Sequence, residues 1–199
     1  MPEPQPAFHR ADPDARRQSL VEATARCLAE RGASGVSVRT ICAEAGVSPG
    51  LLRHYFSGVS EAIAESYRWT GGRVAAALDA AMSTAGPDPR ARLVAYCAAS
   101  FRPPISDPRL LATWLAFWSL TRSDPVIAAV HAELYGDFRA GIERLVAALR
   151  PDLADIHLPA VALTALIDGL WLELSLGDAP FTPAEAEALV ERWIDALLG

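Results

Sequence analysis

The chain has 199 residues, of which 51% are hydrophobic, and a formal net charge of −6. This length suits one large domain, or a small module joined to a larger one, with enough apolar residues for a substantial core. No uninterrupted apolar run reaches the roughly 20 residues of a membrane span. The polar, proline-rich start has no apolar stretch typical of a secretory signal. We expect a cytoplasmic protein, not a membrane protein, with a flexible arm over residues 1–13.

Charge is distributed unevenly along the chain. Residues 1–57 carry seven Arg against six acidic residues, whereas the remainder carries eleven Arg against eighteen acidic residues. The acidic total argues against nucleic-acid binding, but the distribution of charge matters more than its sum. The N-terminal part is therefore the place to look for a surface that binds nucleic acid.

Helix starts recur along the chain as a capping residue followed by proline. The capping oxygen accepts a hydrogen bond from a free first-turn amide, and proline lacks the amide that would go unpaired at the next position. The pairs are Asp12-Pro13, Ser48-Pro49, Asp88-Pro89, Asp107-Pro108, Asp124-Pro125 and Thr182-Pro183. Gly32, Gly46 and Gly86 are expected to end helices, and alternating β patterns are nearly absent.

These signals predict an all-α fold of about nine helices. The expected ranges are 14–31, 38–45, 49–56, 60–84, 89–101, 108–121, 125–149, 159–176 and 183–198. Residues 14–58 would form a small N-terminal module and residues 59–199 a larger helical bundle.

Two short helices near residues 37–57 predict a helix-turn-helix. Ser37 caps the first, Gly46 permits the turn, Ser48 caps the second, and Leu52 and Phe56 point inward. The outward face of the second helix carries residue types that suit DNA: a glycine that permits close approach and groups that donate to phosphates or bases. These are Pro49, Gly50, Leu51, Arg53, His54 and Tyr55. The alternative is that both helices are ordinary parts of a bundle.

The block from Arg16 to Phe56, with AEAGVSPGLLRHYF at its centre, resembles the DNA-binding domain of TetR-family repressors. WLAFW at 114–118 and ALIDGLWL at 165–172 are similar to the choline-sensing BetI-type branch. The resemblance implies a homodimer built on the last two helices, a palindromic operator, and repression relieved by a small molecule. It also implies a set of DNA contacts: Ser37, Arg39, Thr40, Ser48, Pro49, Gly50, Arg53, His54 and Tyr55. The family usually carries a phosphate-binding Lys at the position of Val59, so one salt-dependent contact is expected to be missing.

Large apolar side chains dominate the sixth and eighth expected helices. Trp114, Phe117, Trp118, Asp168 and Trp171 are the candidate ligand-binding residues, and Tyr96, Phe101 and Tyr135 lie on neighbouring helices. Aromatic faces attract quaternary ammonium groups, and a carboxylate adds charge complementarity. The expected effector is such a cation, or an aromatic or hydrophobic compound. The alternative is that these aromatic residues form only core and dimer contacts.

No catalytic motif or metal-ligand spacing is present, so no catalytic residue, metal or cofactor is expected. Cys27, Cys42 and Cys97 are interpreted as buried free thiols, as expected in a reducing compartment. Two other functions stay open from the sequence. One is a helical sensor that acts through a protein partner without operator binding, and the other is a small all-helical enzyme.

Overall fold

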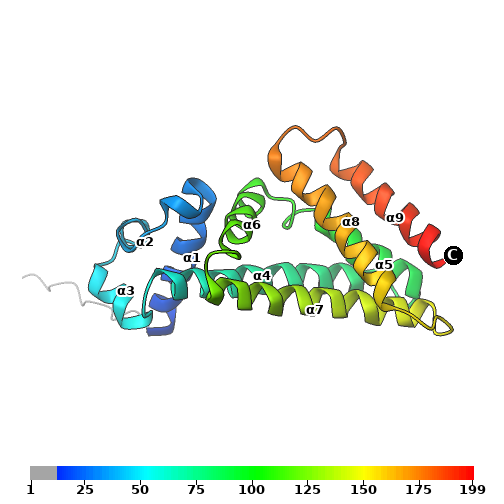
Figure 1. Cartoon of the computed structure of the whole chain (residues 1–199), viewed down its shortest axis with the longest axis horizontal. Coiled ribbons are helices and arrows are strands. Elements are labelled where there is room, and N and C mark those ends of the chain that lie inside the picture. Colours follow the sequence, from blue (N-terminus) through cyan, green and yellow to red (C-terminus); the bar gives the residue numbers. More distant parts are fainter. Residues whose placement is uncertain (1–12) are drawn as a thin grey trace, which may run out of the picture.

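The computed structural model describes residues 13–199, which form nine α-helices and two short 3-10 helices with no strand (Figure 1). This confirms the predicted all-α fold. The elements are α1 (Pro13–Arg31), η1 (Ala33–Gly35), α2 (Val38–Ala45), α3 (Pro49–Tyr55), α4 (Val59–Thr84), α5 (Pro89–Ala98), η2 (Ala99–Phe101), α6 (Pro108–Leu120), α7 (Pro125–Leu149), α8 (His157–Leu176) and α9 (Pro183–Leu198). The expected arm lies outside the described residues, except that Pro13 is the first residue of α1.

Five of the cap-and-proline pairs lie at helix starts as predicted, whereas Asp12 of the sixth lies outside the described residues. The side chains of Asp88, Asp107, Asp124 and Thr182 each accept a hydrogen bond from a first-turn amide, and proline follows each of them. Ser48 occupies the N-cap position of α3, but its hydroxyl accepts no such bond. The predicted capping hydrogen bond of the Ser48 side chain is therefore wrong. The start of α3 depends on Pro49 and on the Ser48 carbonyl, which accepts from the Leu51 amide at 3.0 Å.

Two predicted boundaries differ from the structure by more than one residue. The helix expected over 89–101 ends as α5 at Ala98 and continues as the 3-10 turn η2. Helix α8 begins at His157 because Asp155 accepts hydrogen bonds from the amides of His157 and Leu158, at 2.8 and 3.3 Å. A carboxylate just before the helix, rather than Pro159, therefore sets its start.

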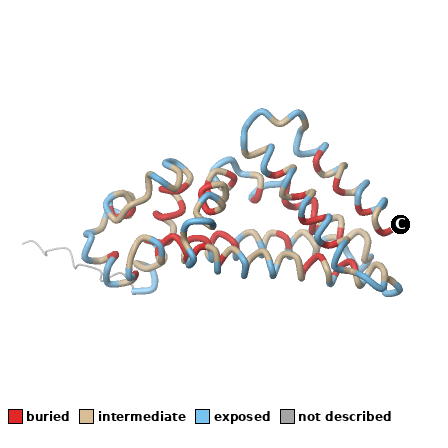
Figure 2. Tube along the Cα trace, viewed as in Figure 1, coloured by how far each residue is buried: buried red, intermediate tan, exposed pale blue. Residues whose placement is uncertain are grey.

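Buried hydrophobic residues form three clusters, and buried positions recur in helices along the described chain (Figure 2). The N-terminal cluster joins α1, α2 and α3 around residues such as Leu20, Ile41 and Leu52. The bundle cluster includes Leu93 and Ile167 and draws on α4, α5, α6, α7, α8 and α9. A junction cluster lies between them and brings Leu28 of α1 together with residues of α4, α6 and α7. The two ends of the molecule are therefore connected by apolar packing.

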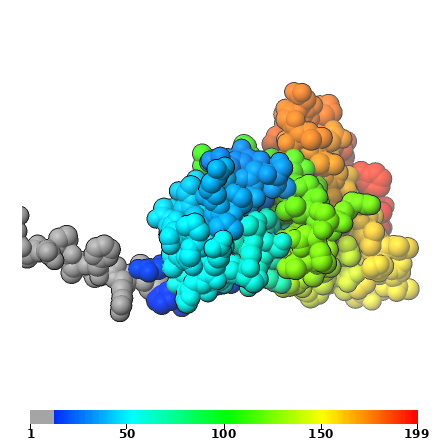
Figure 3. All heavy atoms as spheres, turned by 60° about the vertical axis from the view of Figure 1, so that its left-hand side comes forward, coloured from blue at the N-terminus to red at the C-terminus, as the bar shows by residue number. Residues whose placement is uncertain are grey.

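Helix α4 contributes to all three clusters. It supplies Ala62 to the N-terminal cluster, Tyr67 to the junction cluster and Leu78 to the bundle cluster. It runs beside α7 along the long axis of the molecule (Figure 1), and the N-terminal helices form one lobe packed against the rest of the chain (Figure 3).

Helix α8 carries apolar side chains on its exposed surface as well as on its buried surface. It is the one helix of residues 13–199 that is long and apolar enough to cross a membrane, with a mean hydropathy of 1.4 over its most apolar window, of which 28% is buried. Such a helix is weak evidence for a span, because interface and core helices have the same composition. Its exposed large apolar side chains are Leu158, Val161, Leu172 and Leu176. Trp193 of α9 is also 49% exposed, so this end of the bundle carries an uncovered apolar face.

The turn between α2 and α3 gives a matched test of backbone conformation. Gly46 has φ +65°, and a Cβ there would meet no atom within 4 Å. Gly72, in the exposed middle of α4, is also sterically open but helical. We expect Gly46→Ala to cost about 1 kcal/mol of stability because L-residues disfavour positive φ. Gly72→Ala is expected to raise stability by up to about 1 kcal/mol. Equal effects of both variants on urea unfolding would contradict this interpretation.

Candidate nucleic-acid interface and ligand cavity

The helix-turn-helix is held by a small core and a capping box. Ser37 accepts from the Thr40 amide while the Thr40 hydroxyl accepts from the Ser37 amide, which fixes the start of α2. Leu52 and Phe56 point inward as predicted, with exposed fractions of 0% and 2%. Gly46 adopts the left-handed conformation, and its amide donates to carbonyls at the end of α2. The first residue of α3 is thereby fixed relative to α2.

The outward face of α3 is exposed and rich in donors. Arg53 and His54 are exposed, Tyr55 is half-buried, and the rings of His54 and Tyr55 make an edge contact at 5.0 Å. Ser48, Pro49 and Gly50 are exposed beside them, and Arg39 is exposed on α2.

Arginines on this surface differ from Arg17 and Arg26 of α1 in whether they form ion pairs. Arg17 pairs with Glu65 and Arg26 pairs with Glu44. Within residues 13–199, the guanidinium groups of Arg39 and Arg53 have no carboxylate within ion-pair distance. Their donors are available to phosphate or base edges.

Ser37 and Thr40, by contrast, already have partners. The Thr40 hydroxyl lies 3.1 Å from the carbonyl oxygens of both Gly35 and Ser37, and 3.1 Å from the Ser37 hydroxyl. These hydroxyls primarily organise the start of α2. Val59, where the resemblance led us to expect a missing phosphate contact, is the first residue of α4 and packs against the N-terminal and junction clusters.

A cavity of about 390 Å³ lies in the bundle and is lined by residues of α4, α5, α6, α7 and α8. Its volume is within the range of small-molecule sites. Trp114 of α6 and Trp171 of α8 meet edge to face at 5.9 Å, and Tyr96 of α5 stacks on Phe138 of α7 at 5.8 Å. The indole nitrogen of Trp171 donates to the Ser100 carbonyl at 3.1 Å, which fixes the orientation of that ring.

Gly141 allows Tyr96 to reach this position. A Cβ on Gly141 would lie 2.5 Å from the Tyr96 hydroxyl oxygen, closer than any real contact. The absence of a side chain on α7 therefore lets the Tyr96 ring lie against that helix and form part of the cavity wall.

Asp168 of α8 places a carboxylate in the wall of the cavity. Tyr135 donates a hydrogen bond to its Oδ1 at 3.1 Å. Burial raises the pKa of Asp168 to about 6, although the bond from Tyr135 and the charge of Arg139 act in the opposite direction. A neighbouring cation would favour the ionised form of this carboxyl group.

The cavity as a whole is acidic. Its lining includes the carboxylates of Asp79, Glu133, Asp137 and Asp168, against the guanidinium groups of Arg68 and Arg144. Arg68 is itself paired with Glu65 at 3.0 Å and Glu133 at 3.4 Å. The local charge therefore favours a cation over an anion.

Three of the five candidate ligand residues line this cavity: Trp114, Asp168 and Trp171. Phe117 lies outside it, fully buried in the junction cluster and stacked on Tyr67 at 4.1 Å. Trp118 also lies outside the lining, beside Trp171 at 6.2 Å. An aromatic stripe along one helix spans more than one environment, so helical spacing alone does not separate cavity residues from core residues.

The cavity residues on α7 were less visible in the sequence. Tyr135 is expected from the sequence only to approach from a neighbouring helix, and the sequence predicts no cavity role for Phe138, Glu133 or Asp137. Their spacing is that of an ordinary amphipathic helix. The sequence therefore gives no signal that separates these cavity-lining residues from other residues of α7. Phe101, also expected to approach, is buried in the bundle cluster and does not line the cavity.

The cysteines and the potential metal-ligating side chains lie as follows. Cys27, Cys42 and Cys97 are buried free thiols, as predicted. Within residues 13–199, no three His, Cys, Asp or Glu side chains are grouped in a way that could hold a metal ion.

Family models cover both ends of the chain. Residues 20–60 match the model described as bacterial regulatory proteins of the tetR family. Residues 89–199, more than half of the chain, match the model described as BetI-type transcriptional repressor, C-terminal.

Individual relatives agree with these models. The HTH-type transcriptional regulator BetI of Burkholderia thailandensis is 33% identical over 187 residues, covering 92% of this chain and 93% of that protein. BetI of Burkholderia cenocepacia is 31% identical over 191 residues, covering 92% and 94%.

Solved structures show the same architecture. A transcriptional regulator from Pseudomonas aeruginosa PAO1 superposes with a TM-score of 0.87 at 43% identity, covering 96% of this chain and 94% of that one. A regulator from Saccharomonospora viridis in complex with choline has the same fold, with a TM-score of 0.79 at 21% identity and coverage of 92% and 96%. Together with the helix-turn-helix and the bundle, these matches show that the chain is a helix-turn-helix transcriptional regulator of the TetR family, with a C-terminal domain of the BetI type.

Proposed function

We propose that this regulator represses transcription as a cytoplasmic homodimer bound to a palindromic operator, and that a quaternary ammonium compound in the aromatic cavity releases it. The observation that carries the effector class is the half-buried carboxylate of Asp168 among Trp114, Trp171 and Tyr135. In this proposal residues 14–58 read DNA, and residues 59–199 bind the effector and dimerise.

The unpaired donors on α2 and α3 support the assignment of the DNA surface. Arg53 would contact a base edge or phosphate, with Arg39, His54 and Tyr55 on the flanking phosphates. Ser48, Pro49 and Gly50 would let the start of α3 approach the backbone closely. Ser37 and Thr40 would act mainly by presenting the first turn of α2 to a phosphate.

The uncovered apolar face supports a homodimer. Leu158, Val161, Leu172 and Leu176 are exposed on α8, and the exposed residues between them include Ala162, Ala165 and Gly169. Small residues flanked by large apolar ones allow two copies of a helix to pack closely about a two-fold axis. Dimerisation would also place two α3 helices roughly 34–36 Å apart, the spacing of successive major grooves.

The cavity supports a cationic effector. Aromatic faces attract quaternary ammonium groups, and the acidic lining supplies the counter-charge. The Saccharomonospora viridis protein of the same fold holds choline. Trp114, Trp171 and Asp168 would contact the cation, while Phe117 and Trp118 would support the wall from behind.

A continuous set of side chains joins the cavity to the DNA-binding end. Tyr135, which bonds Asp168, lies 4.3 Å from the His131 ring, and His131 Nδ1 is 2.9 Å from the Tyr67 hydroxyl. Tyr67 stacks on Phe117 in the junction cluster, which includes Leu28 of α1. Neutralising Asp168 with a cation would alter the bond from Tyr135, and this set of contacts gives the change a route to α1.

Operator binding is tested by substitutions that remove hydrogen-bond donors from α3 and leave the hydrophobic core of the helix-turn-helix intact. Arg53→Ala and Tyr55→Phe are each expected to weaken binding by about 10-fold or more, because each removes a contact to DNA. Arg122→Ala, at an exposed arginine between α6 and α7, is the matched control. The measurement is a gel shift with the intergenic DNA beside the gene. Unchanged binding by Arg53→Ala would contradict the proposed surface.

The dimer is tested by placing charge on the apolar face. Leu172→Glu and Trp193→Glu are expected to shift the protein toward monomer, because a buried unpaired carboxylate is costly. Val126→Glu is the control, since Val126 is 46% exposed on α7 rather than on the α8 and α9 face. Sedimentation analysis over a range of concentrations measures the change. A monomeric wild type would remove the basis for two-groove binding.

The cationic effector is tested through pH. With its pKa raised to about 6, Asp168 is ionised above that pH and protonated below it. Choline affinity is therefore expected to fall by about 10-fold between pH 7 and pH 5, since each unit below the pKa reduces the ionised fraction about tenfold. Asp168→Asn should bind choline weakly and without this pH dependence.

The neutral isostere 3,3-dimethylbutanol, measured by calorimetry beside choline, controls for shape. Equal affinity for the alcohol, or choline affinity that does not change with pH, would contradict the role of Asp168.

A further inference from the structure

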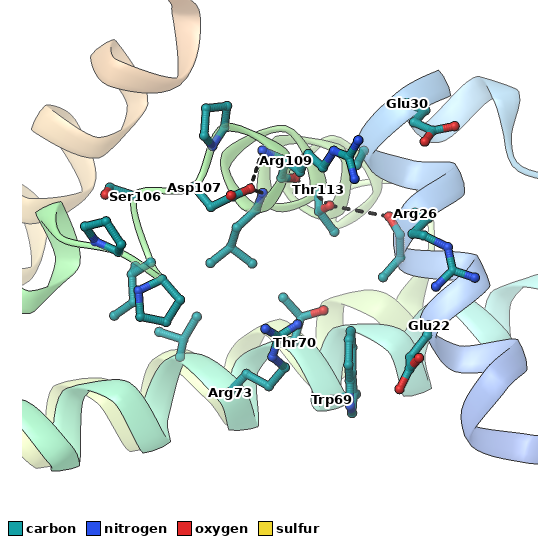
Figure 4. A pocket seen from close by; sticks show the side chains of 18 residues that line it. Glu22, Arg26, Glu30, Trp69, Thr70, Arg73, Ser106, Asp107, Arg109 and Thr113 are labelled. Carbon is teal, nitrogen blue, oxygen red and sulfur yellow. Dashed lines mark hydrogen bonds between the residues drawn. The ribbon is translucent and has the colours of Figure 1, made fainter. Parts of the chain in front are cut away.

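A second cavity of about 800 Å³ lies outside the aromatic one, where the DNA-binding end meets the bundle. Residues of α1 form one side, the loop before α6 lies opposite them, and the first turns of α6 lie across the cavity from α4 (Figure 4). Val74 and Ile105 line both cavities. The two cavities therefore have part of their apolar lining in common.

The charged groups of this cavity are not all satisfied by the protein. Arg26 is paired with Glu44 at 2.7 Å, and Asp107 accepts from the amides of Arg109 and Leu110 at 2.8 and 3.3 Å. Within residues 13–199, no carboxylate lies within ion-pair distance of the Arg73 or Arg109 guanidinium groups. These two arginines, one on α4 and one in the first turn of α6, retain free donors.

The remaining lining is apolar and includes a flat aromatic surface. Trp69 lies on α4 beside Arg73, whose guanidinium carbon is 4.9 Å from the ring centroid (Figure 4). Pro103, Pro104 and Leu110 add apolar surface to the lining. A ligand with an apolar body and a charged end would match this division between hydrophobic surface and free guanidinium groups.

We propose that this cavity binds a small organic monocarboxylate, with its carboxylate held by Arg73 and Arg109 and its apolar body against Trp69. Guanidinium groups pair with carboxylates through two parallel hydrogen bonds, which makes them suited to this anion. Glu22 and Glu30 of α1 also face the cavity. Their charge disfavours ligands that carry more than one negative charge, so a monoanion is preferred.

The position of the cavity gives the bound anion a consequence for DNA binding. At the edge of the cavity the Thr113 hydroxyl reaches the Ala25 carbonyl at 3.4 Å (Figure 4), and beyond it α1 packs directly against α6. An occupant in contact with α1, α4 and α6 together would stabilise one arrangement of the DNA-binding end relative to the bundle. This regulatory consequence rests on the proposed function, whereas binding of the anion itself does not.

Calorimetry of the full chain with benzoate and octanoate tests the site. We expect binding of both, and at least 10-fold weaker binding of benzamide, the neutral isostere of benzoate. Arg73→Ala and Arg109→Ala should each weaken benzoate binding by 10-fold or more, whereas Arg122→Ala should not change it. Both target arginines are exposed, and circular dichroism of each variant verifies that it is folded.

Fluorescence provides an independent readout. Benzoate is expected to change the emission of Trp69, and Trp69→Phe should abolish that change while Arg73 remains in place. The proposal is overturned if neither carboxylate binds at millimolar concentration, if benzamide binds as well as benzoate, or if Arg73→Ala retains wild-type affinity. None of these measurements involves DNA or choline, so their failure is distinct from failure of the proposed function.

Discussion

Helix α4 passes through all three hydrophobic clusters, and the other parts of the structure depend on that continuity. Its 26 residues span about 39 Å at 1.5 Å per residue, from the end of the helix-turn-helix to the far end of the bundle. Because Ala62, Tyr67 and Leu78 are each buried in a different cluster, α4 cannot rotate or slide without disturbing all of them. Residues of this helix line both cavities, and Val74 belongs to both linings.

The bundle combines a charge that is costly to bury with surroundings that accept a cation. Asp168 receives a hydrogen bond from Tyr135 and feels the charge of Arg139, but burial outweighs both, so its ionised form is disfavoured when no further cation is present. The same low-polarity surroundings strengthen its attraction for a cation that enters. In the proposed site, preference for a cation therefore arises because the protein itself supplies too few interactions to stabilise the charge of this carboxylate. In the second cavity the groups without an ion-pair partner among the described residues are the guanidinium groups of Arg73 and Arg109, within a lining that also carries Glu22, Glu30 and Asp107.

Sequence reasoning located most of the fold because the local signals act within one helical turn. Asp88, Asp107, Asp124 and Thr182 cap helices next to proline, and such pairs are readable without tertiary information. The limits appear where a choice depends on packing. The Ser48 hydroxyl caps nothing although its residue type suits a cap, and Phe117 lies in the core although it shares a helix with Trp114. The cavity wall on α7 and the cavity between α1 and α6 depend on contacts between distant segments, which no local pattern encodes.

The placement of the buried cysteines allows the two ends of the protein to be followed separately. Cys42 lies in the N-terminal cluster and Cys97 in the bundle cluster, and burial raises the pKa of each thiol, that of Cys97 to about 12. A thiol in such surroundings reacts with an alkylating reagent only when its part of the chain opens. The rates of labelling at the two positions therefore report the opening free energies of the DNA-reading end and of the bundle. The natural sequence thus carries its own pair of probes for local unfolding.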